Sequence, residues 1–127
     1  MAETQKKQFT PKEANKRLPL VKQIVEDILL RGKELKDLTA SSAAKAETSA
    51  QGLALRSEIQ ELMQELEALG CYYKDWDFET GLVDFPGIID GHPVFFCWSF
   101  EEKEVRFFHD IDESFNCRKV IPAHYLN

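Results

Sequence analysis

The sequence predicts an α+β fold in which a long N-terminal antiparallel helical hairpin packs on a small three- to four-stranded antiparallel sheet. Up to Gly70, apolar residues recur every three or four positions, which is typical of amphipathic helices. After Gly70, apolar and polar residues alternate, which indicates strands. The 127 residues suit one domain. We expect the hairpin over residues 10–70, the sheet over 71–115 and an irregular tail over 116–127.

The first helix is predicted to begin after Thr10. Thr10, Pro11 and Glu13 form a capping-box pattern with proline at the first helical position. Pro19 removes a backbone amide, so we expect a kink or a restart near Leu18. A stripe with spacings of three and four residues carries the helix to about Thr39. Its members are Leu18, Val21, Val25, Ile28, Gly32, Leu35 and Leu38.

The turn of the hairpin is predicted over residues 39–51, which are small and polar and offer little to bury, so we expect this tip to be partly helical and mobile. A second helix follows, and Gly70 is its natural C-terminal stop. Its apolar positions are spaced as in a coiled-coil seam: Leu55, Ile59, Leu62, Leu66 and Leu69.

Three strands are predicted over residues 81–86, 92–100 and 105–109, with a fourth over 72–76. Asp90-Gly91 is a strong hairpin signal between the first two. Side chains on a strand alternate between faces. Polar and apolar residues separate best if one face, placed against the helices, carries Phe96, Trp98, Phe100, Val105, Phe107 and His109. The same parity places Asp84 on the face opposite His109.

Charge narrows the choice of partners. The formal net charge of −6 argues against a nucleic-acid binder, which needs a basic surface. From Cys71 onward there are eleven Asp and Glu against five Lys and Arg, so this half attracts cations. We expect no membrane partner and a cytoplasmic location, because the sequence shows neither an apolar run of membrane-spanning length nor a signal-peptide pattern. The odd count of three cysteines argues against a disulfide framework.

Several strings together resemble a small bacterial family catalogued as domain of unknown function 2203. The resemblance covers nearly the whole chain and implies a helical hairpin with a sheet in a cytoplasmic bacterial protein, without an established activity. It rests on Phe9-Thr10-Pro11-Lys12-Glu13-Ala14-Asn15, Leu18-Pro19, Leu69-Gly70, Lys74-Asp75, Thr80-Gly81-Leu82-Val83-Asp84-Phe85-Pro86, Phe96-Cys97-Trp98, His109-Asp110-Ile111-Asp112 and Phe115.

The leading chemical hypothesis is a metal site at the end of the sheet. His109 offers a nitrogen donor beside Asp112 and Glu113, with Asp84 as a less certain third ligand. Imidazole with carboxylates is a ligand set for zinc, manganese, iron or nickel. A structural alternative stays open, because Asp110 and Glu113 also fit a capping pattern. We expect no organic cofactor, since the sequence contains no Gly-rich phosphate loop.

Two other classes remain as alternatives. Cys97, or Cys117 beside Arg118 and Lys119, is a candidate nucleophile, although no positioned base accompanies either. The hairpin is a candidate interaction module. Its first helix carries seven Lys and Arg against five Asp and Glu, and its second carries one against four. Such helices could pair hairpins between two subunits as a homodimer, or both apolar stripes could be used within one chain, against each other and the sheet. On this interpretation the protein is non-catalytic.

Overall fold

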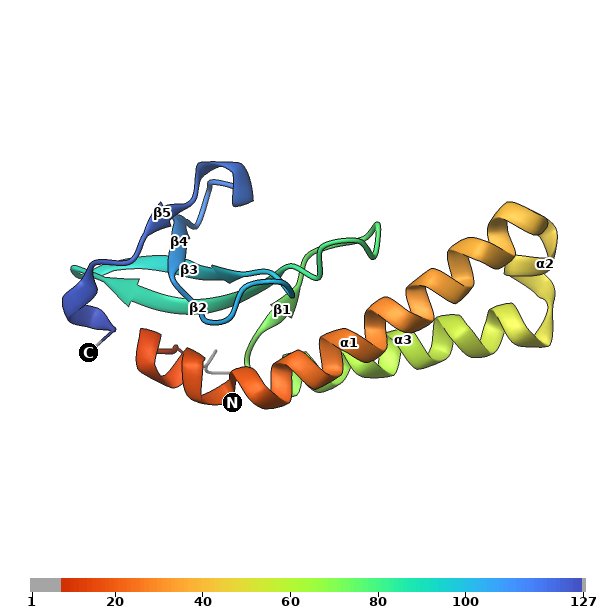
Figure 1. Cartoon of the computed structure of the whole chain (residues 1–127), viewed down its shortest axis with the longest axis horizontal. Helices are drawn as coiled ribbons and strands as arrows, with labels where there is room; N and C mark the ends of the chain where they lie inside the picture. Colours follow the sequence, from red (N-terminus) through yellow and green to blue (C-terminus); the bar gives the residue numbers. More distant parts are fainter. Residues whose placement is uncertain (1–7, 127) are drawn as a thin grey trace, which may run out of the picture.

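The computed structural model describes residues 8–126 (Figure 1). Two long helices, α1 (Pro11–Ser41) and α3 (Ala50–Ala68), lie side by side, with a short helix α2 (Ala43–Thr48) between them in the chain. The expected hairpin is therefore present in outline, and its turn contains the short helix α2, as predicted for a partly helical tip. The far half of the two helices extends beyond the sheet as an arm (Figure 1).

Helix α1 begins as its sequence predicts. The Glu13 amide donates to the Thr10 hydroxyl at 3.1 Å, and the Glu13 carboxylate accepts from the Thr10 amide at 2.9 Å. The helix does not restart at Pro19 but runs through it to Ser41. Its buried stripe contains Gly32, where a Cβ would lie 2.3 Å from the Phe78 ring, so only glycine fits at this crossing.

Helices α2 and α3 begin with serine caps. Ser42 accepts from the Lys45 amide and Ser49 from the Gly52 amide. Gly52 allows the two helices to approach closely, because a Cβ there would lie 2.2 Å from the Ala46 carbonyl oxygen. The α3 residues Leu55, Ile59 and Leu66 are buried within the chain, as the spacing predicts. Pairing of hairpins between two chains stays a prediction.

The sheet has five antiparallel strands in the order β1-β2-β3-β4-β5, rather than the three or four expected. The fifth strand comes from the tail predicted to be irregular, which also contains two short 3-10 helices. The strands are β1 (Tyr72–Tyr73), β2 (Val83–Ile89), β3 (His92–Trp98), β4 (Phe107–Asp110) and β5 (Lys119–Val120), and the 3-10 helices are η1 (Phe115–Cys117) and η2 (Ala123–Tyr125).

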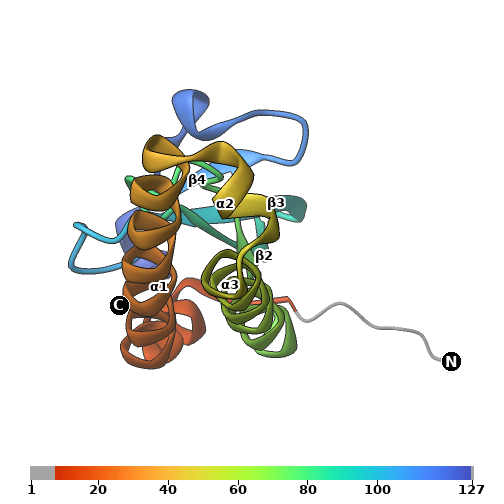
Figure 2. The same ribbon diagram turned by 90° about the vertical axis from the view of Figure 1, so that its right-hand side faces the viewer.

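The molecule has two layers, with the helices on one face of the sheet (Figures 1 and 2). The core lies between them, and Phe85, Phe96 and Trp98 are its largest fully buried side chains. The segment that joins β4 to β5, with η1 in it, lies on the side of the sheet away from the helices (Figure 1). In the described part of the chain, no helix has the length and apolar character needed to cross a bilayer.

Candidate metal centre

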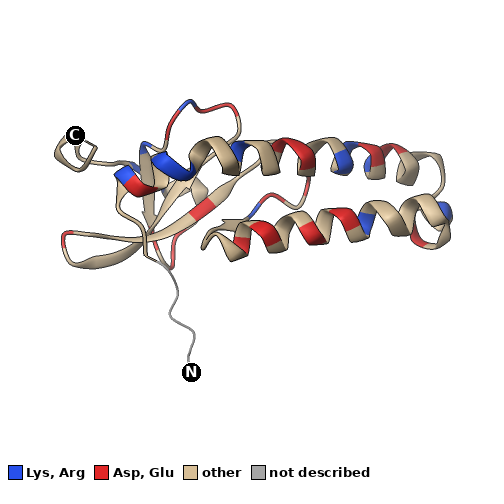
Figure 3. Ribbon diagram, turned by 90° about the horizontal axis from the view of Figure 1, so that it is seen from below, with Lys and Arg blue, Asp and Glu red and all other residues tan. Residues whose placement is uncertain are grey.

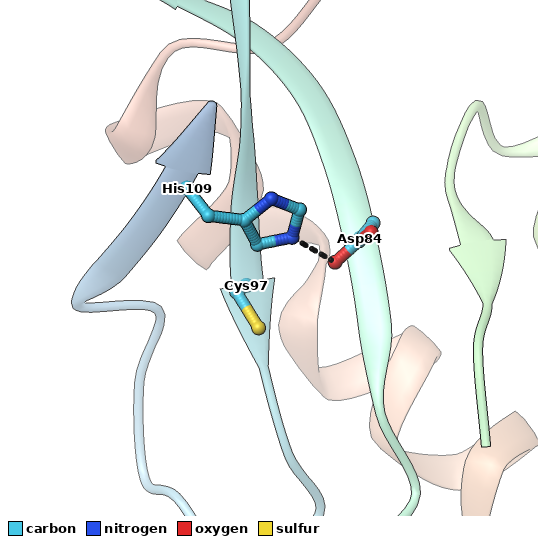
Figure 4. A group of neighbouring side chains, drawn as sticks. All are labelled: Asp84, Cys97 and His109. Atoms are coloured by element: carbon cyan, nitrogen blue, oxygen red, sulfur yellow. Dashed lines mark hydrogen bonds and ion pairs between the residues drawn. The ribbon is translucent and has the colours of Figure 1, made fainter. Parts of the chain in front are cut away.

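Three chemically active side chains converge on the face of the sheet that is turned away from the helices. Asp84 comes from β2, Cys97 from β3 and His109 from β4 (Figure 4). One donor atom from each lies within 4.8 Å of the other two, and all three residues are buried. Asp84 pairs directly with Cys97 in the sheet, and His109 reaches across β3 to join them.

The predicted face assignment of β4 was wrong, and the error is a shift of one residue. Phe96 pairs with Phe108, and Phe95 pairs with His109, so His109 lies opposite the helices. Phe107 shares that outer face, since it pairs with Cys97. The prediction that Asp84 points away from His109 is wrong for the same reason: both occupy the outer face.

Asn15 explains why the alternation failed. Its side-chain amide donates to the Val105 carbonyl at 3.2 Å, and its side-chain oxygen accepts from the Val105 amide at 2.7 Å. Helix α1 thereby holds Val105 in the core before the strand begins at Phe107. Val105 lies outside the regular strand. The alternation of faces counted from Val105 therefore gives the wrong face for Phe107 and His109 in β4.

The hydrogen bonds of His109 determine which ring nitrogen faces the cluster. Nδ1 lies 2.8 Å from the backbone carbonyl oxygen of Asp110, and a carbonyl oxygen only accepts, so Nδ1 carries a hydrogen. In the neutral ring, Nε2 then presents its lone pair to Asp84 Oδ1 at 3.4 Å. A lone pair facing a carboxylate needs a cation, either a proton or a metal ion, between the two.

His109 Nε2 and Asp84 Oδ1 lie too far apart for a strong hydrogen bond. Charge-assisted N–H···O contacts are about 2.7–2.9 Å long, whereas Nε2 and Oδ1 lie 3.4 Å apart. Two ligands that each lie about 2.1 Å from a tetrahedral ion are separated by about 3.4 Å. A ligating histidine also commonly donates its second ring N–H to a backbone carbonyl. The His109 geometry has both features.

Burial disfavours the ionised forms of the two other groups. It raises the pKa of Asp84, although His109 and Lys74 oppose the shift. Burial, reinforced by the charge of Asp84, raises the pKa of the Cys97 thiol to about 12. A thiol with that pKa is not a nucleophile at neutral pH, so the chain's own groups do not activate Cys97. A bound cation would favour both deprotonated forms.

Replacing Asp84 with asparagine is expected to raise the melting temperature of the metal-free protein at neutral pH. Because the folded-state pKa of Asp84 is raised, the protonated carboxyl favours folding below about pH 4, and that contribution is lost as the pH rises through the folded-state pKa. The amide of the substituted side chain has no charge to bury. Scanning calorimetry across pH would measure the gain, which should vanish in acid. A lower melting temperature at neutral pH would contradict it.

The cluster lies at one side of a cavity of about 330 Å³. Its walls include the Lys74 side chain and the apolar side chains of Leu82, Phe95, Ile111 and Phe115. Glu113 also lines this cavity, but its carboxylate accepts from the Asp110 amide at 3.3 Å and lies 3.8 Å from the Lys119 ammonium. These contacts belong to a turn: the Glu113 amide donates to the Asp110 carbonyl at 3.0 Å, and among the described residues no helix begins directly after Asp110, so the predicted helix cap is present only as the Asp110 amide to Glu113 carboxylate bond.

The four residues predicted as metal ligands are only partly brought together. His109 and Asp84 meet, and Glu113 lies on the wall of the same cavity. Asp112 is exposed and borders a different hollow, beside Asp110 and Pro93.

The sequence reasoning missed Cys97 as a partner of the histidine. The signal that could have found it is the pairing of the two central strands. With the Asp90-Gly91 turn, β2 and β3 place Asp84 directly opposite Cys97. Cys117 is exposed and lies outside the cluster, and all three cysteines are free thiols.

Comparison with known proteins agrees with the resemblance seen in the sequence. The model of the DUF2203 family, described as an uncharacterized conserved protein, matches residues 7–121. The chain belongs to this family. No curated protein and no solved structure matches it. Membership of DUF2203 therefore brings no activity with it, and the function must be argued from the geometry of Asp84, Cys97 and His109.

Proposed function

We propose that this DUF2203 protein binds a divalent transition metal ion, with His109 Nε2 and Asp84 Oδ1 as two of the ligands and the Cys97 sulfur as a third. The observation that carries the proposal is the arrangement of His109. Its Nδ1 lies 2.8 Å from a backbone carbonyl oxygen, and its Nε2 faces the buried Asp84 carboxylate at 3.4 Å.

Burial and charge support a cation at this point. Asp84, Cys97 and His109 are 6%, 1% and 4% exposed, so the acidic groups are largely removed from water. An ion would compensate the buried carboxylate of Asp84, and its binding would require the deprotonated forms of Asp84 and Cys97. Binding should therefore weaken as the pH falls, since protons compete for the same atoms.

The donor set narrows the choice of ion. A nitrogen, a carboxylate oxygen and a thiolate suit zinc and iron better than manganese, because thiolate is a soft ligand. Three protein ligands leave one position of a tetrahedral site for water. The cavity beside the three donors, lined also by Lys74, Leu82 and Phe115, has room for such a water. Glu113, on the cavity wall, could bind through such a water.

Elemental analysis of the full chain, purified without a metal-affinity tag, tests the proposal. We expect about one metal ion per chain, and at least a tenfold loss of affinity in His109→Ala. His92→Ala is the matched control, since His92 is exposed at the β2–β3 turn and should leave the metal content unchanged. Metal content far below one per chain, and equal in both variants, would mean that the cluster is a hydrogen-bonded structural pair.

Cobalt substitution tests the third ligand separately. If Cys97 binds the ion, the cobalt-loaded protein should show a thiolate-to-cobalt charge-transfer band that disappears in Cys97→Ser. Cys71→Ser is the control, because Cys71 is a buried thiol outside the cluster. Asp112→Ala addresses the ligand expected from sequence. Loss of metal in Asp112→Ala, with retention in Cys97→Ser, would shift the site toward the β4–η1 loop.

A further inference from the structure

A second hollow lies on the helix side of the molecule, away from the candidate metal centre. It is a groove of about 690 Å³ between the first turns of α1, the loop joining β3 to β4, and the end of the chain. This size lies within the range of small-molecule pockets. We call it the lysine groove, and its lining residues are Lys12, Asn15, Lys16, Leu18, Pro19, Lys22, Lys103, Glu104 and Leu126.

Positive charge is concentrated at the lysine groove in an otherwise acidic protein. The groove holds four of the sixteen Lys and Arg residues of the chain, against one carboxylate, that of Glu104. Lys and Arg gather on the first turns of α1, whereas Asp and Glu predominate along α3 (Figure 3). Such a local excess of one sign attracts the opposite charge even when the net charge of the chain is also negative.

Within the described part of the chain, no carboxylate pairs with the ammonium groups of the lysine groove. Lys12, Lys16, Lys22 and Lys103 take part in none of the ion pairs found among residues 8–126. By contrast, Lys36 and Lys119, outside the groove, each contact carboxylates. The Lys22 ammonium lies 5.7 Å from the centre of the Phe100 ring, within the range of a cation–π contact.

The lysine groove also offers apolar contact and a backbone acceptor. Its apolar lining residues are Pro19, Leu126 and Leu18, of which Leu18 is largely buried in the core. Pro19 has no amide hydrogen, so the Asn15 carbonyl in the same wall lacks its usual helical donor. The Asn15 side chain is already bound to Val105 and holds the wall in place.

We propose that the lysine groove binds a small amphipathic anion, with a carboxylate or phosphate head among the lysines and an apolar body on Leu18, Pro19 and Leu126. The excess of positive charge favours an anionic head group, and the apolar residues of the groove favour an apolar body on the ligand. The groove lies on α1, whereas Asp84, Cys97 and His109 lie on the outer face of the sheet, so this binding does not depend on a metal ion.

Calorimetric titration of the full chain with hexyl phosphate, hexanoate and hexanol tests the proposal. We expect at least one of the two anions to bind saturably at one per chain, and the tighter anion identifies the head group. Hexanol and inorganic phosphate should each bind at least tenfold more weakly than that anion, and its affinity should fall as salt is added. Equal binding of hexanol, equal binding of inorganic phosphate, or no saturable binding of either anion would overturn the proposal.

A pair of matched double variants locates the binding. Lys16→Gln with Lys103→Gln should weaken binding of the anion by about tenfold, since two attractive charges are removed from the groove. Lys33→Gln with Lys45→Gln removes the same charge from the arm and should leave the affinity unchanged. If both double variants weaken binding equally, the affinity depends only on the net charge of the chain, and the proposal of a defined site at the groove is overturned.

Discussion

Replacing Asp75 with alanine is expected to lower the free energy of unfolding by about 3 kcal/mol or more. Its buried carboxylate accepts four backbone amides of the following loop: those of Asp77, Glu79, Thr80 and Gly81, at 3.2, 2.7, 2.7 and 2.9 Å. Alanine would leave these donors without their partner. Urea unfolding followed by circular dichroism would measure the loss.

The loop held by Asp75 links the two layers of the fold. It places Phe78, at a positive φ of 56°, over Gly32 of α1 and stacks it on Tyr73. The loop ends at Gly81, shortly before β2, the strand that carries Asp84. Loss of the Asp75 hydrogen bonds should therefore also loosen the approach to the candidate metal centre.

Two variants and a pH series separate this effect from general destabilisation. Asp75→Asn, which keeps one oxygen acceptor, should lose less stability than Asp75→Ala. Asp77→Ala changes an exposed residue of the same loop and should stay within about 0.5 kcal/mol of the parent. Equal losses in Asp75→Ala and Asp77→Ala would contradict the role of the buried carboxylate.

The pH series follows from the same hydrogen bonds. Burial alone would raise the pKa of Asp75, but the amides of Gly81, Thr80, Glu79 and Asp77 together hold it below its usual value. The stabilisation is therefore present above about pH 4 and lost as the pH falls through the folded-state pKa. The difference between the parent and Asp75→Ala should shrink in acid.

Replacing Trp98 with alanine is expected to cost about 3–5 kcal/mol, a large share of the stability of an ordinary domain. Trp98 is fully buried at the end of β3, and its indole nitrogen donates to the Glu102 carbonyl at 2.9 Å. Alanine would leave a cavity in the core and would deprive that carbonyl of its donor. The urea midpoint, followed by far-UV circular dichroism, would report the change.

Trp76→Ala is the matched control for this prediction. Trp76 is 66% exposed in the loop after β1, so its loss should cost no more than about 0.5 kcal/mol. Trp98→Phe should fall between the two, because it keeps an aromatic ring in the core but loses the hydrogen bond to Glu102. Similar costs for Trp98→Ala and Trp76→Ala would show that the core is not centred on Trp98.

The features that could be predicted from the sequence are those that neighbouring residues decide. The cap of α1 needs only Thr10, Pro11 and Glu13, and the β2–β3 turn needs only Asp90 and Gly91. The helical stripes follow from a spacing that every helix imposes. For the same reason, the α+β class and the helix-then-sheet order were correct.

Other features depend on residues far apart in the chain. A fifth strand forms because Lys119 and Val120 find an open edge on β4, which their own sequence does not indicate. The boundaries of β2 moved to Val83–Ile89 because pairing with β3 continues through Pro86 to the turn. The strand propensity of a segment does not say which sheet edge it can pair with. It therefore could not predict the fifth strand or the full length of β2.

The candidate site shows the same division most clearly. From the sequence alone, His109 and its neighbouring carboxylates were identified as the place for a cation, because residue chemistry is visible in sequence. The tertiary structure decided that His109 meets Asp84 and Cys97 rather than Asp112. The reason is physical: Asn15 of α1 holds Val105 outside the strand, which shifts the register by one residue and turns His109 to the outer face.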